Sequence, residues 1–284
     1  MPAAWVFFAV CLNAQAQPGD VRQIWDKSRV DAAQAAAKPA PPKPAAPAKP
    51  AAAKPAAEPP PAPHPNLIGV TLWLLRPKQA ADPEESVIVD VKTKARYTAT
   101  RASLNTPLTV GQKVRLSIES LRPGYLYVID REKFTDGTLG EPAMLFPSQS
   151  IRGGDNRVEA GIAVEVPGQK DPTPYFDITA EDPRLAAEQI TILLTEQPLP
   201  GIVAGTERLS PALVDSWEKS WGTSVRQSEE KDALGKLYTK AEREAGESGT
   251  RRLSRNDPRP QTTYQVDARP GQALLVHVNL SVRR

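Results

Sequence analysis

The stretch Lys113–Leu121, KVRLSIESL, decides the fold of this chain. Its side chains alternate along the segment: Val114, Leu116 and Ile118 fall on one face, opposite Arg115, Ser117 and Glu119. A period of two residues is typical of a β-strand, because successive side chains of a strand point to opposite faces. The pattern therefore predicts a strand that buries its apolar face and leaves its polar face in water.

Similar segments recur on both sides of this stretch. We expect further strands at residues 67–75, 86–91, 125–130, 143–146, 158–166, 175–178, 189–195 and 273–282. Turn signals such as Pro123-Gly124 and Asp136-Gly137 separate them. Many short strands with regular turns predict a mainly β fold, an antiparallel β-sandwich that occupies residues 66–284.

Two helices are predicted before the last strand. Ser210-Pro211 supplies a capping serine and a proline at the first helical position. Leu213, Val214, Trp217 and Trp221 then fall on one face. A second, more polar helix is predicted over 229–245, followed by a loop over 247–263. Because the terminal strand must return to the sheet, we interpret residues 211–245 as a helical insertion in the sandwich.

The N-terminus has the features of an export signal. Residues 3–12 form a short apolar run, and Ala14-Gln15-Ala16 after it suits cleavage before Gln17. The run is too short for a transmembrane helix, which needs about 20 apolar residues. Residues 1–16 are therefore predicted to be a signal peptide, and the protein to be periplasmic or secreted. The only cysteine, Cys11, lies inside this signal, so the mature chain is expected to lack disulfides and thiol chemistry.

Between the signal and the sandwich lie two segments. Residues 38–65 are almost entirely Ala, Pro and Lys, which predicts a disordered linker because such a composition buries too little apolar surface to fold. Residues 17–37 form a short segment that could be helical, with Val21, Ile24, Trp25 and Ser28 on one side. Trp25 makes this segment a candidate docking peptide for an envelope partner; the alternative is a disordered lead-in.

The charge distribution argues against a nucleic-acid partner. Four lysines and one glutamate give residues 38–65 a formal charge of +3, which equals that of the whole chain. Residues 66–284 are therefore neutral overall, whereas nucleic-acid-binding domains concentrate Lys and Arg. The spaced lysines could contact anionic envelope polymers or lipid, or they could simply keep the linker soluble.

No residue constellation predicts a reaction. The only histidine of the predicted sandwich is His277, and no G-x-S-x-G motif presents a serine nucleophile. The set of His and Cys residues is too small for a zinc site, and the acidic run at Asp130, Glu132 and Asp136 matches a calcium loop poorly. We therefore expect no catalytic residues, no metal and no cofactor.

A tryptophan pair offers a candidate binding surface. Trp217 and Trp221 are one helical turn apart and could form an exposed aromatic platform for a glycan or a peptide. The alternative interpretation is that they anchor the helix to the sheet.

The run Gly111–Pro147, GQKVRLSIESLRPGYLYVIDREKFTDGTLGEPAMLFP, resembles a bacterial domain of unknown function, family 4384. The family pattern falls on Gly111, Val114, Leu116, Ser120, Gly124, Tyr125, Leu126, Tyr127, Asp130, Gly137 and Leu145-Phe146-Pro147. The likeness continues through residues 153–161, Val166-Pro167 and 190–195. This resemblance implies an envelope or secreted β-sandwich and supplies no catalytic residues.

These observations predict an exported, non-enzymatic interaction or scaffold module of the bacterial cell envelope, held by a proline-rich tether. Its partner would be an envelope protein or a cell-wall polymer. Two alternatives remain: a glycan-binding module that uses Trp217 and Trp221, and a glycan hydrolase that uses carboxylates. The sequence does not indicate an oligomeric state.

Overall fold

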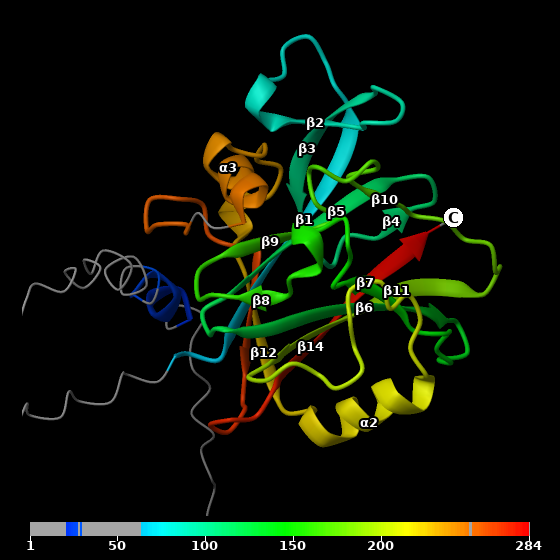
Figure 1. Ribbon diagram of the computed structural model, residues 1–284. Coiled ribbons are helices and arrows are strands. Elements are labelled where there is room, and N and C mark those ends of the chain that lie inside the picture. The colour runs from blue at the N-terminus through cyan, green and yellow to red at the C-terminus, as the bar shows by residue number, and fades with distance from the viewer. Residues whose placement is uncertain (1–20, 28, 30–63, 250–251, 284) are drawn as a thin grey trace, which may run out of the picture.

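The computed structural model describes residues 21–27, 29, 64–249 and 252–283. The predicted signal peptide and residues 38–63 of the predicted linker lie outside this part of the chain. The described residues fold into two packed sheets with helices outside them (Figure 1). The fold class predicted from the sequence, a mainly β sandwich with helices before the last strand, is confirmed.

One sheet, here called the β1 sheet, contains eight strands within the described residues. They are β1 (Leu67–Pro77), β2 (Val87–Val89), β3 (Arg96–Ala102), β5 (Lys113–Ser120), β9 (Ala163–Val166), β10 (Phe176–Asp177), β12 (Val225–Glu229) and β13 (Thr262–Val266). Strand β1 is central: β5 pairs along one edge, while β13 and β3 pair in turn along the other.

The other sheet, here called the β11 sheet, has six strands among the same residues. They are β4 (Leu108–Thr109), β6 (Gly124–Phe134), β7 (Ala143–Phe146), β8 (Arg157–Val158), β11 (Leu185–Thr195) and β14 (Leu274–Arg283). Pairing is antiparallel except between β4 and β14, which run parallel. The connections that the structure describes contain three short 3-10 turns, Glu84–Ser86, Arg152–Gly154 and Lys231–Ala233.

The main core lies between the two sheets. The β1 sheet contributes Ile68, Val70, Leu72, Val114, Leu116 and Ile118, and the β11 sheet contributes Leu126, Val128, Ile190, Ile192, Val276 and Val278, among others. Each set alternates along its strand, as the sequence pattern predicts for a buried face. The apolar face expected for 113–121 is confirmed.

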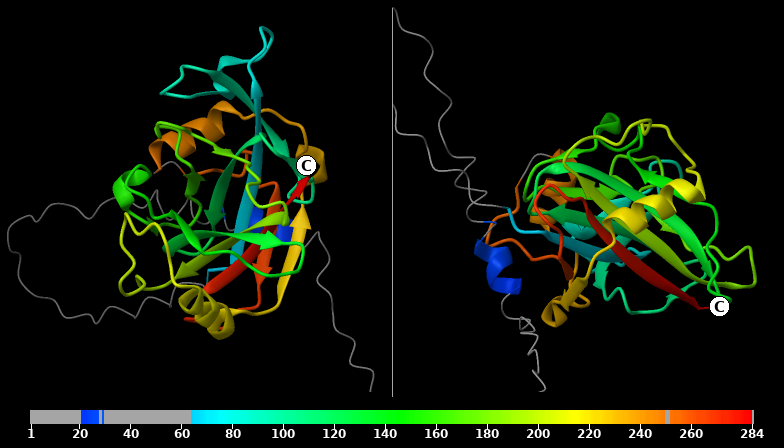
Figure 2. Two further views of the ribbon diagram at one scale, coloured as in Figure 1. Left: turned by 90° about the vertical axis from the view of Figure 1, so that its right-hand side faces the viewer. Right: turned by 90° about the horizontal axis from the view of Figure 1, so that it is seen from below.

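Helix α2 (Pro211–Trp221) covers the outer face of the β11 sheet (Figure 2). Ser210 caps it: the Ser210 side chain accepts a hydrogen bond from the Leu213 amide, and Pro211 occupies the first turn. Val214 and Trp217 pack against Tyr127, Leu193 and Leu275 of the sheet. The helix predicted from Ser210-Pro211 is therefore confirmed.

The second predicted helix begins later than expected. Residues 225–229 form β12, which pairs with β13, and helix α3 spans only Lys240–Ser248. Gly235 has a φ of 73°, which an α-helix does not accept, and Thr239 caps the new start in a capping box with Glu242. The predicted helix over 229–245 was thus wrong in its first half, and the loop predicted over 247–263 ends in β13.

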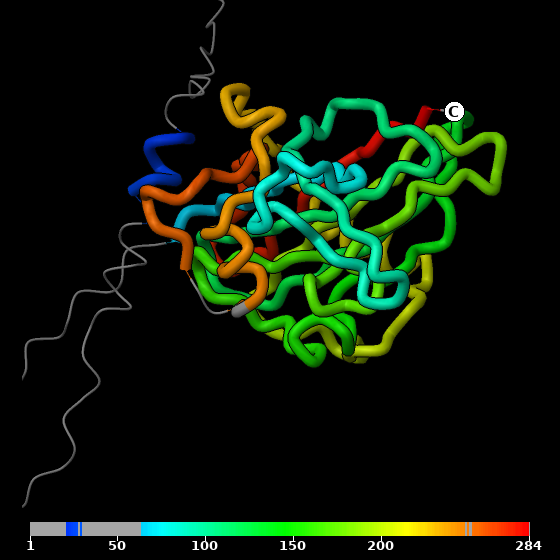
Figure 3. The backbone as a smooth tube through the Cα atoms, turned by 90° about the horizontal axis from the view of Figure 1, so that it is seen from above, coloured from blue at the N-terminus to red at the C-terminus, as the bar shows by residue number. Residues whose placement is uncertain are grey.

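The outer face of the β1 sheet is also covered. Helix α3, residues 252–261 and an N-terminal helical segment (residues 21–27 and 29) lie over it (Figure 3). Arg115 and Glu119, which the alternation placed in water, are therefore buried, at 0% and 3% exposed. This prediction was wrong because a two-residue period shows which side chains share a face but not what covers that face.

No helix within the described residues is long and apolar enough to span a bilayer.

Candidate functional site

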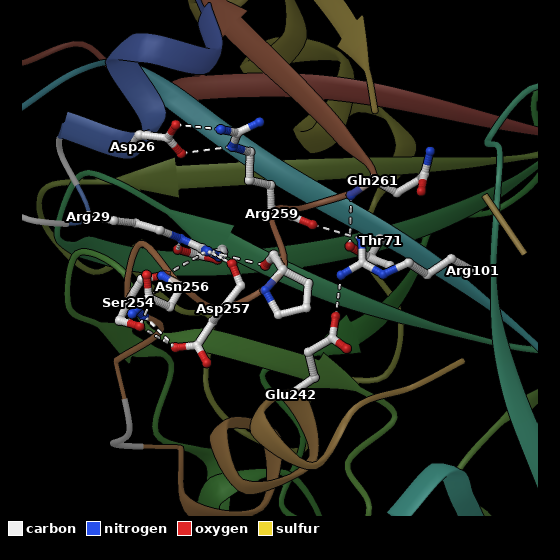
Figure 4. Close-up of polar contacts among 12 residues, drawn as sticks. Asp26, Arg29, Thr71, Arg101, Glu242, Ser254, Asn256, Asp257, Arg259 and Gln261 are labelled. Atoms are coloured by element: carbon white, nitrogen blue, oxygen red, sulfur yellow. Dashed lines mark hydrogen bonds and ion pairs between the residues drawn. The ribbon is translucent and has the colours of Figure 1, made fainter. Parts of the chain in front are cut away.

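The N-terminal helical segment packs on the outer face of the β1 sheet, between β5 and residues 252–261 (Figure 4), and we call the surface that it covers the helix groove. Val21, Trp25 and Arg29 are spaced four residues apart, so they share one side of the helix. All three are buried against the sandwich, whereas Gln23 and Lys27 are exposed. The segment predicted to be helical is therefore helical where described, and it docks on its own chain.

A notch above strand β1 holds the Trp25 ring. The ring is 1% exposed and packs with Val21, Leu67 and Leu121. A Cβ atom at Gly69 would lie 2.7 Å from Cη2 of Trp25 and 2.2 Å from Cγ of Pro260. Only glycine leaves room for both rings at this point of the strand. Among the described residues the indole N–H has no hydrogen-bond partner, so the ring is held by apolar packing and by the Arg29 guanidinium, whose Cζ lies 5.7 Å from the ring centroid.

One turn further along the helix, Arg29 is buried in an ion pair with Glu119 of β5. Arg29 Nε donates to Glu119 Oε1 at 3.0 Å, and Nη2 donates to Oε2 at 2.5 Å. Nη1 donates to the carbonyl oxygens of Asp257 and Pro258 at 3.2 and 3.1 Å. A guanidinium matches a carboxylate in this two-pronged geometry, and the carbonyls satisfy the remaining donor. Burial of both charges is tolerated because all of these groups are paired.

The segment 252–261 closes the groove from the other side. Arg259 donates to both carboxylate oxygens of Asp26, at 2.7 Å from Nε and 2.5 Å from Nη2. Glu230 forms ion pairs with Arg259 and with Arg22, at nitrogen–oxygen distances of 3.3 and 3.0 Å. Hydrogen bonding to Asp26 raises the pKa of Arg259 above its ordinary value. The helix is therefore held by charges on both flanks and by Trp25 between them.

A second layer of buried pairs supports the groove. Arg101 of β3 pairs with Glu242 of α3, and its Nη1 donates to the Arg259 carbonyl at 2.7 Å. Thr71 supports the same segment, because its hydroxyl oxygen accepts from the Gln261 amide at 3.0 Å. Arg101 of the sheet thus holds the backbone carbonyl of Arg259, while the Arg259 side chain contacts Asp26 of the N-terminal helix (Figure 4).

A third buried pair lies next to α3. Arg115 Nη2 donates to Glu165 Oε2 at 2.6 Å, and the Tyr238 hydroxyl donates to the same carboxylate. Burial raises the pKa of the Glu165 carboxyl, although the positive charge of Arg115 acts to lower it. Burial also raises the pKa of Tyr238 well above its ordinary value. A Cβ at Gly246 would lie 2.2 Å from the Glu165 carboxyl carbon, so α3 contacts this pair directly.

The tryptophan pair of α2 lies elsewhere, on the β11 sheet. Trp217 is 8% exposed and packs against the sheet, which fits the interpretation of this pair as an anchor. Trp221 is half-buried and stacks on Trp217, with ring centroids 6.3 Å apart and planes 19° apart. Because the sheet covers Trp217, the two rings do not form an exposed platform together.

Carboxylates gather at the inner face of the β11 sheet. Glu132 of β6 pairs in register with Glu188 of β11, and Asp130 with Ile190. Burial raises the pKa of Asp130 to about 6 and that of Glu188 to about 8, and the charges of Asp130 and Glu132 add to the shift at Glu188. Within the described residues, no three His, Cys, Asp or Glu side chains are grouped to hold a metal ion.

The sequence singled out Trp25 as a docking residue, but it did not predict the residues that surround the docked helix or pair with it: Arg29, Gly69, Glu119 and Arg259. Two signals were present. Gly69 interrupts an otherwise bulky strand, which is typical of a close approach by another element. Val21, Trp25 and Arg29 recur every four residues, and this spacing places an arginine on the apolar side of the helix.

Residues 108–198 match the model of a protein family described as Domain of unknown function (DUF4384). The matched stretch runs from β4 to beyond the end of β11, which confirms the family resemblance there. It includes Glu119 but not Trp25, Arg29 or Arg259. Comparison with curated proteins and with solved structures finds no match.

Proposed function

We propose that the protein is an exported, non-enzymatic interaction module of the bacterial cell envelope, and that its sandwich binds an amphipathic helix in the helix groove. The observation that carries this proposal is the burial of Trp25 and Arg29, each 1% exposed, by residues from β1, β5 and the 252–261 segment. The export part rests on the apolar run at 3–12 and the Ala14-Gln15-Ala16 pattern.

The groove recognises a specific pattern. It offers an apolar notch over Gly69 and, one helical turn away, a buried carboxylate at Glu119. A helix that fits both features carries an aromatic residue and an arginine four positions apart. Lysine would fit less well, because it lacks the planar fork that engages both oxygens of Glu119. The expected partner is therefore an envelope protein that presents such a helix.

The chain's own helix competes for the groove. Trp25 and Leu67 pack in one cluster, so both ends of the intervening segment are attached at one place on the sandwich. The composition of residues 38–65 predicts a flexible tether, and such a tether would give the attached helix an effective concentration in the millimolar range. A partner helix must therefore bind the groove tightly enough to displace the attached helix. The predicted tether would then connect a docked segment to the sandwich rather than act as a spacer.

A peptide experiment tests the groove. The mature chain carrying Trp25→Ala and Arg29→Gln should bind a fluorescent peptide of residues 17–31, whereas wild type should bind it weakly because its own helix occupies the groove. The Trp221→Ala variant is the matched control and should behave as wild type. Failure of the peptide to bind the double variant would contradict the proposal, as would equal binding to all three proteins.

The location requires its own test. Fractionation of the native host should place a chain that starts at Gln17 in the periplasm or the medium. An intact chain with residues 1–16 still attached in the cytosol would contradict export.

A further inference from the structure

A second site lies at the end of the sandwich where β1 begins. It is a cleft of about 610 Å³, and its walls come from residues 64–66, the β5–β6 turn, β8, the end of β11 and the β13–β14 turn. This volume falls in the range of small-ligand sites, which is roughly 300–1,000 Å³. The cleft is separate from the helix groove, because none of the residues that contact Trp25 or Arg29 line it.

Arg122 is the anchoring group of the cleft. It is 8% exposed, and its Nη1 donates to the Gln272 carbonyl at 2.9 Å and to Asn66 Oδ1 at 3.4 Å. Asn66 in turn donates from Nδ2 to the Ala268 carbonyl at 2.8 Å, which fixes the amide orientation. The guanidinium is therefore held in one position before any ligand arrives.

The remaining side of Arg122 faces a half-exposed carboxylate. Nη2 donates to Glu196 Oε1 at 2.6 Å, and the Glu196 side chain is 50% exposed. A half-exposed side chain loses little when it rotates into water, because exposed ion pairs contribute little to stability. Glu196 thus occupies the position in which the carboxylate of a ligand would meet Arg122.

Arg157 supplies a second positive charge. It lies on β8 opposite Tyr125 of β6 and is exposed, and it lines the same cleft. Arg122 and Arg157 against Glu196 give the lining an excess of one positive formal charge. Polar groups at Asn66 and Gln197 and the half-buried Tyr125 ring complete a site for a small polar anion.

We infer that this cleft binds a small ligand through a free carboxylate, with Arg122 as the buried anchor, Arg157 as the outer cation and Glu196 as the internal group that the ligand displaces. A peptide C-terminus and a sugar acid both supply this chemistry. Arginine engages either carboxylate with the same two-pronged geometry. The inference does not rest on the helix groove, and either can fail alone.

Ligand-detected NMR titration of the mature chain tests the inference. The probes are N-acetyl-alanyl-alanine with a free carboxylate, the same dipeptide as its C-terminal amide, and glucuronate. We expect at least one acid to bind at millimolar concentration or below and the amide to bind at least about tenfold more weakly, since it lacks the charge that Arg122 pairs. Which acid binds more tightly separates the peptide source from the sugar source.

Three variants separate this role from a structural ion pair. Glu196→Gln should tighten binding of the acid by several-fold, because it removes the competing carboxylate. Glu84→Gln, at an exposed carboxylate in the 3-10 turn between β1 and β2, is the charge-matched control. Arg157→Gln should weaken the acid several-fold, with Arg184→Gln as its control. Arg122→Gln should abolish binding, and a thermal melt shows whether that variant still folds.

Three results would overturn the inference. The first is equal affinity of the acid and the amide, and the second is the absence of any acid binding to both wild type and Glu196→Gln. Weaker binding after Glu196→Gln would also overturn it, because a purely structural pair loses order when either partner is removed. These readouts do not depend on whether Arg122→Gln folds.

Discussion

Arg29 and Glu119 are ninety positions apart in the sequence and form a two-pronged ion pair in which both side chains are almost completely buried. Arg29 comes from the N-terminal helix and Glu119 from a central strand. The pair therefore fixes the start of the described chain onto the β1 sheet. Because the desolvation of both charges offsets much of their attraction, such a pair adds little net stability, but loss of one partner leaves a buried charge unpaired and is strongly destabilising.

The pair should show strong coupling in a double-mutant cycle. Glu119→Gln alone leaves a buried guanidinium without its counter-ion, which should cost about 3–5 kcal/mol of unfolding free energy unless the helix undocks. Arg29→Gln should therefore cost less unfolding free energy in the Glu119→Gln variant than in the wild-type protein. Urea denaturation measures all four proteins, with the exposed Lys240–Glu244 pair as the control cycle. Additive effects at Arg29 and Glu119 would contradict the pairing.

Trp25→Ala should release the helix without unfolding the sandwich. The ring fills the notch over Gly69, and truncation of a buried tryptophan typically costs about 3–5 kcal/mol. Hydrogen exchange should therefore accelerate over residues 21–29 and the first residues of β1, while β6 and β11 keep their protection. Unchanged exchange over residues 21–29 in the variant would show that Trp25 does not hold the segment.

Stability should fall as the pH rises from about 4 to about 8. Asp130 has a pKa of about 6 and Glu188 a pKa of about 8 in the folded protein, above ordinary values of 3.8 and 4.5. In this window the folded state holds more protons than the unfolded state, so raising the pH favours unfolding. The burial of His277 lowers its pKa and acts in the opposite direction below pH 6.5.

Glu188→Gln isolates the carboxylate contribution. The variant should resemble wild type at pH 4 and have a higher melting temperature at pH 8, with the difference growing between those values. Glu181→Gln, an exposed carboxylate, is the control. A melting temperature of Glu188→Gln that lies below wild type at pH 8 would contradict the raised pKa.

The two tryptophans of α2 should differ in their effect on stability. Trp217 packs into the apolar layer between α2 and the β11 sheet, so Trp217→Ala should cost about 3–5 kcal/mol of unfolding free energy. Trp221 is half-buried, so Trp221→Ala should cost clearly less. Chemical denaturation compares the two. Equal small losses would show that neither tryptophan anchors the helix.

The strands that were predicted well are those with strong apolar alternation or apolar runs. Residues 143–146 form β7 with the predicted bounds, and 189–195 forms most of β11. Strands β3, β12 and β13 were missed because their segments, such as VRQSE and RYTATRA, are rich in polar residues. Their pairing with β1 and β13 stabilises them more than local preference does.

The site could be predicted only in part. Trp25 was singled out because it is the one aromatic residue of its segment, but its burial depends on Gly69 and Pro260, which are far away in the sequence. Glu119 was expected in water because the alternation of β5 does not reveal a cover made of α3, residues 252–261 and the N-terminal helix. Long-range contacts of this kind leave no periodic signal.

Photo-crosslinking from position 22 tests the docked helix most directly. Arg22 lies 3.0 Å from Glu230 and its side chain is 42% exposed, so a benzoylphenylalanine in its place reaches the β12 end without filling the notch. In a mixture of isotopically labelled and unlabelled mature chains, mass spectrometry should find crosslinks to residues 228–231 within single chains. Crosslinks scattered along the chain, or absent from residues 228–231, would contradict the account.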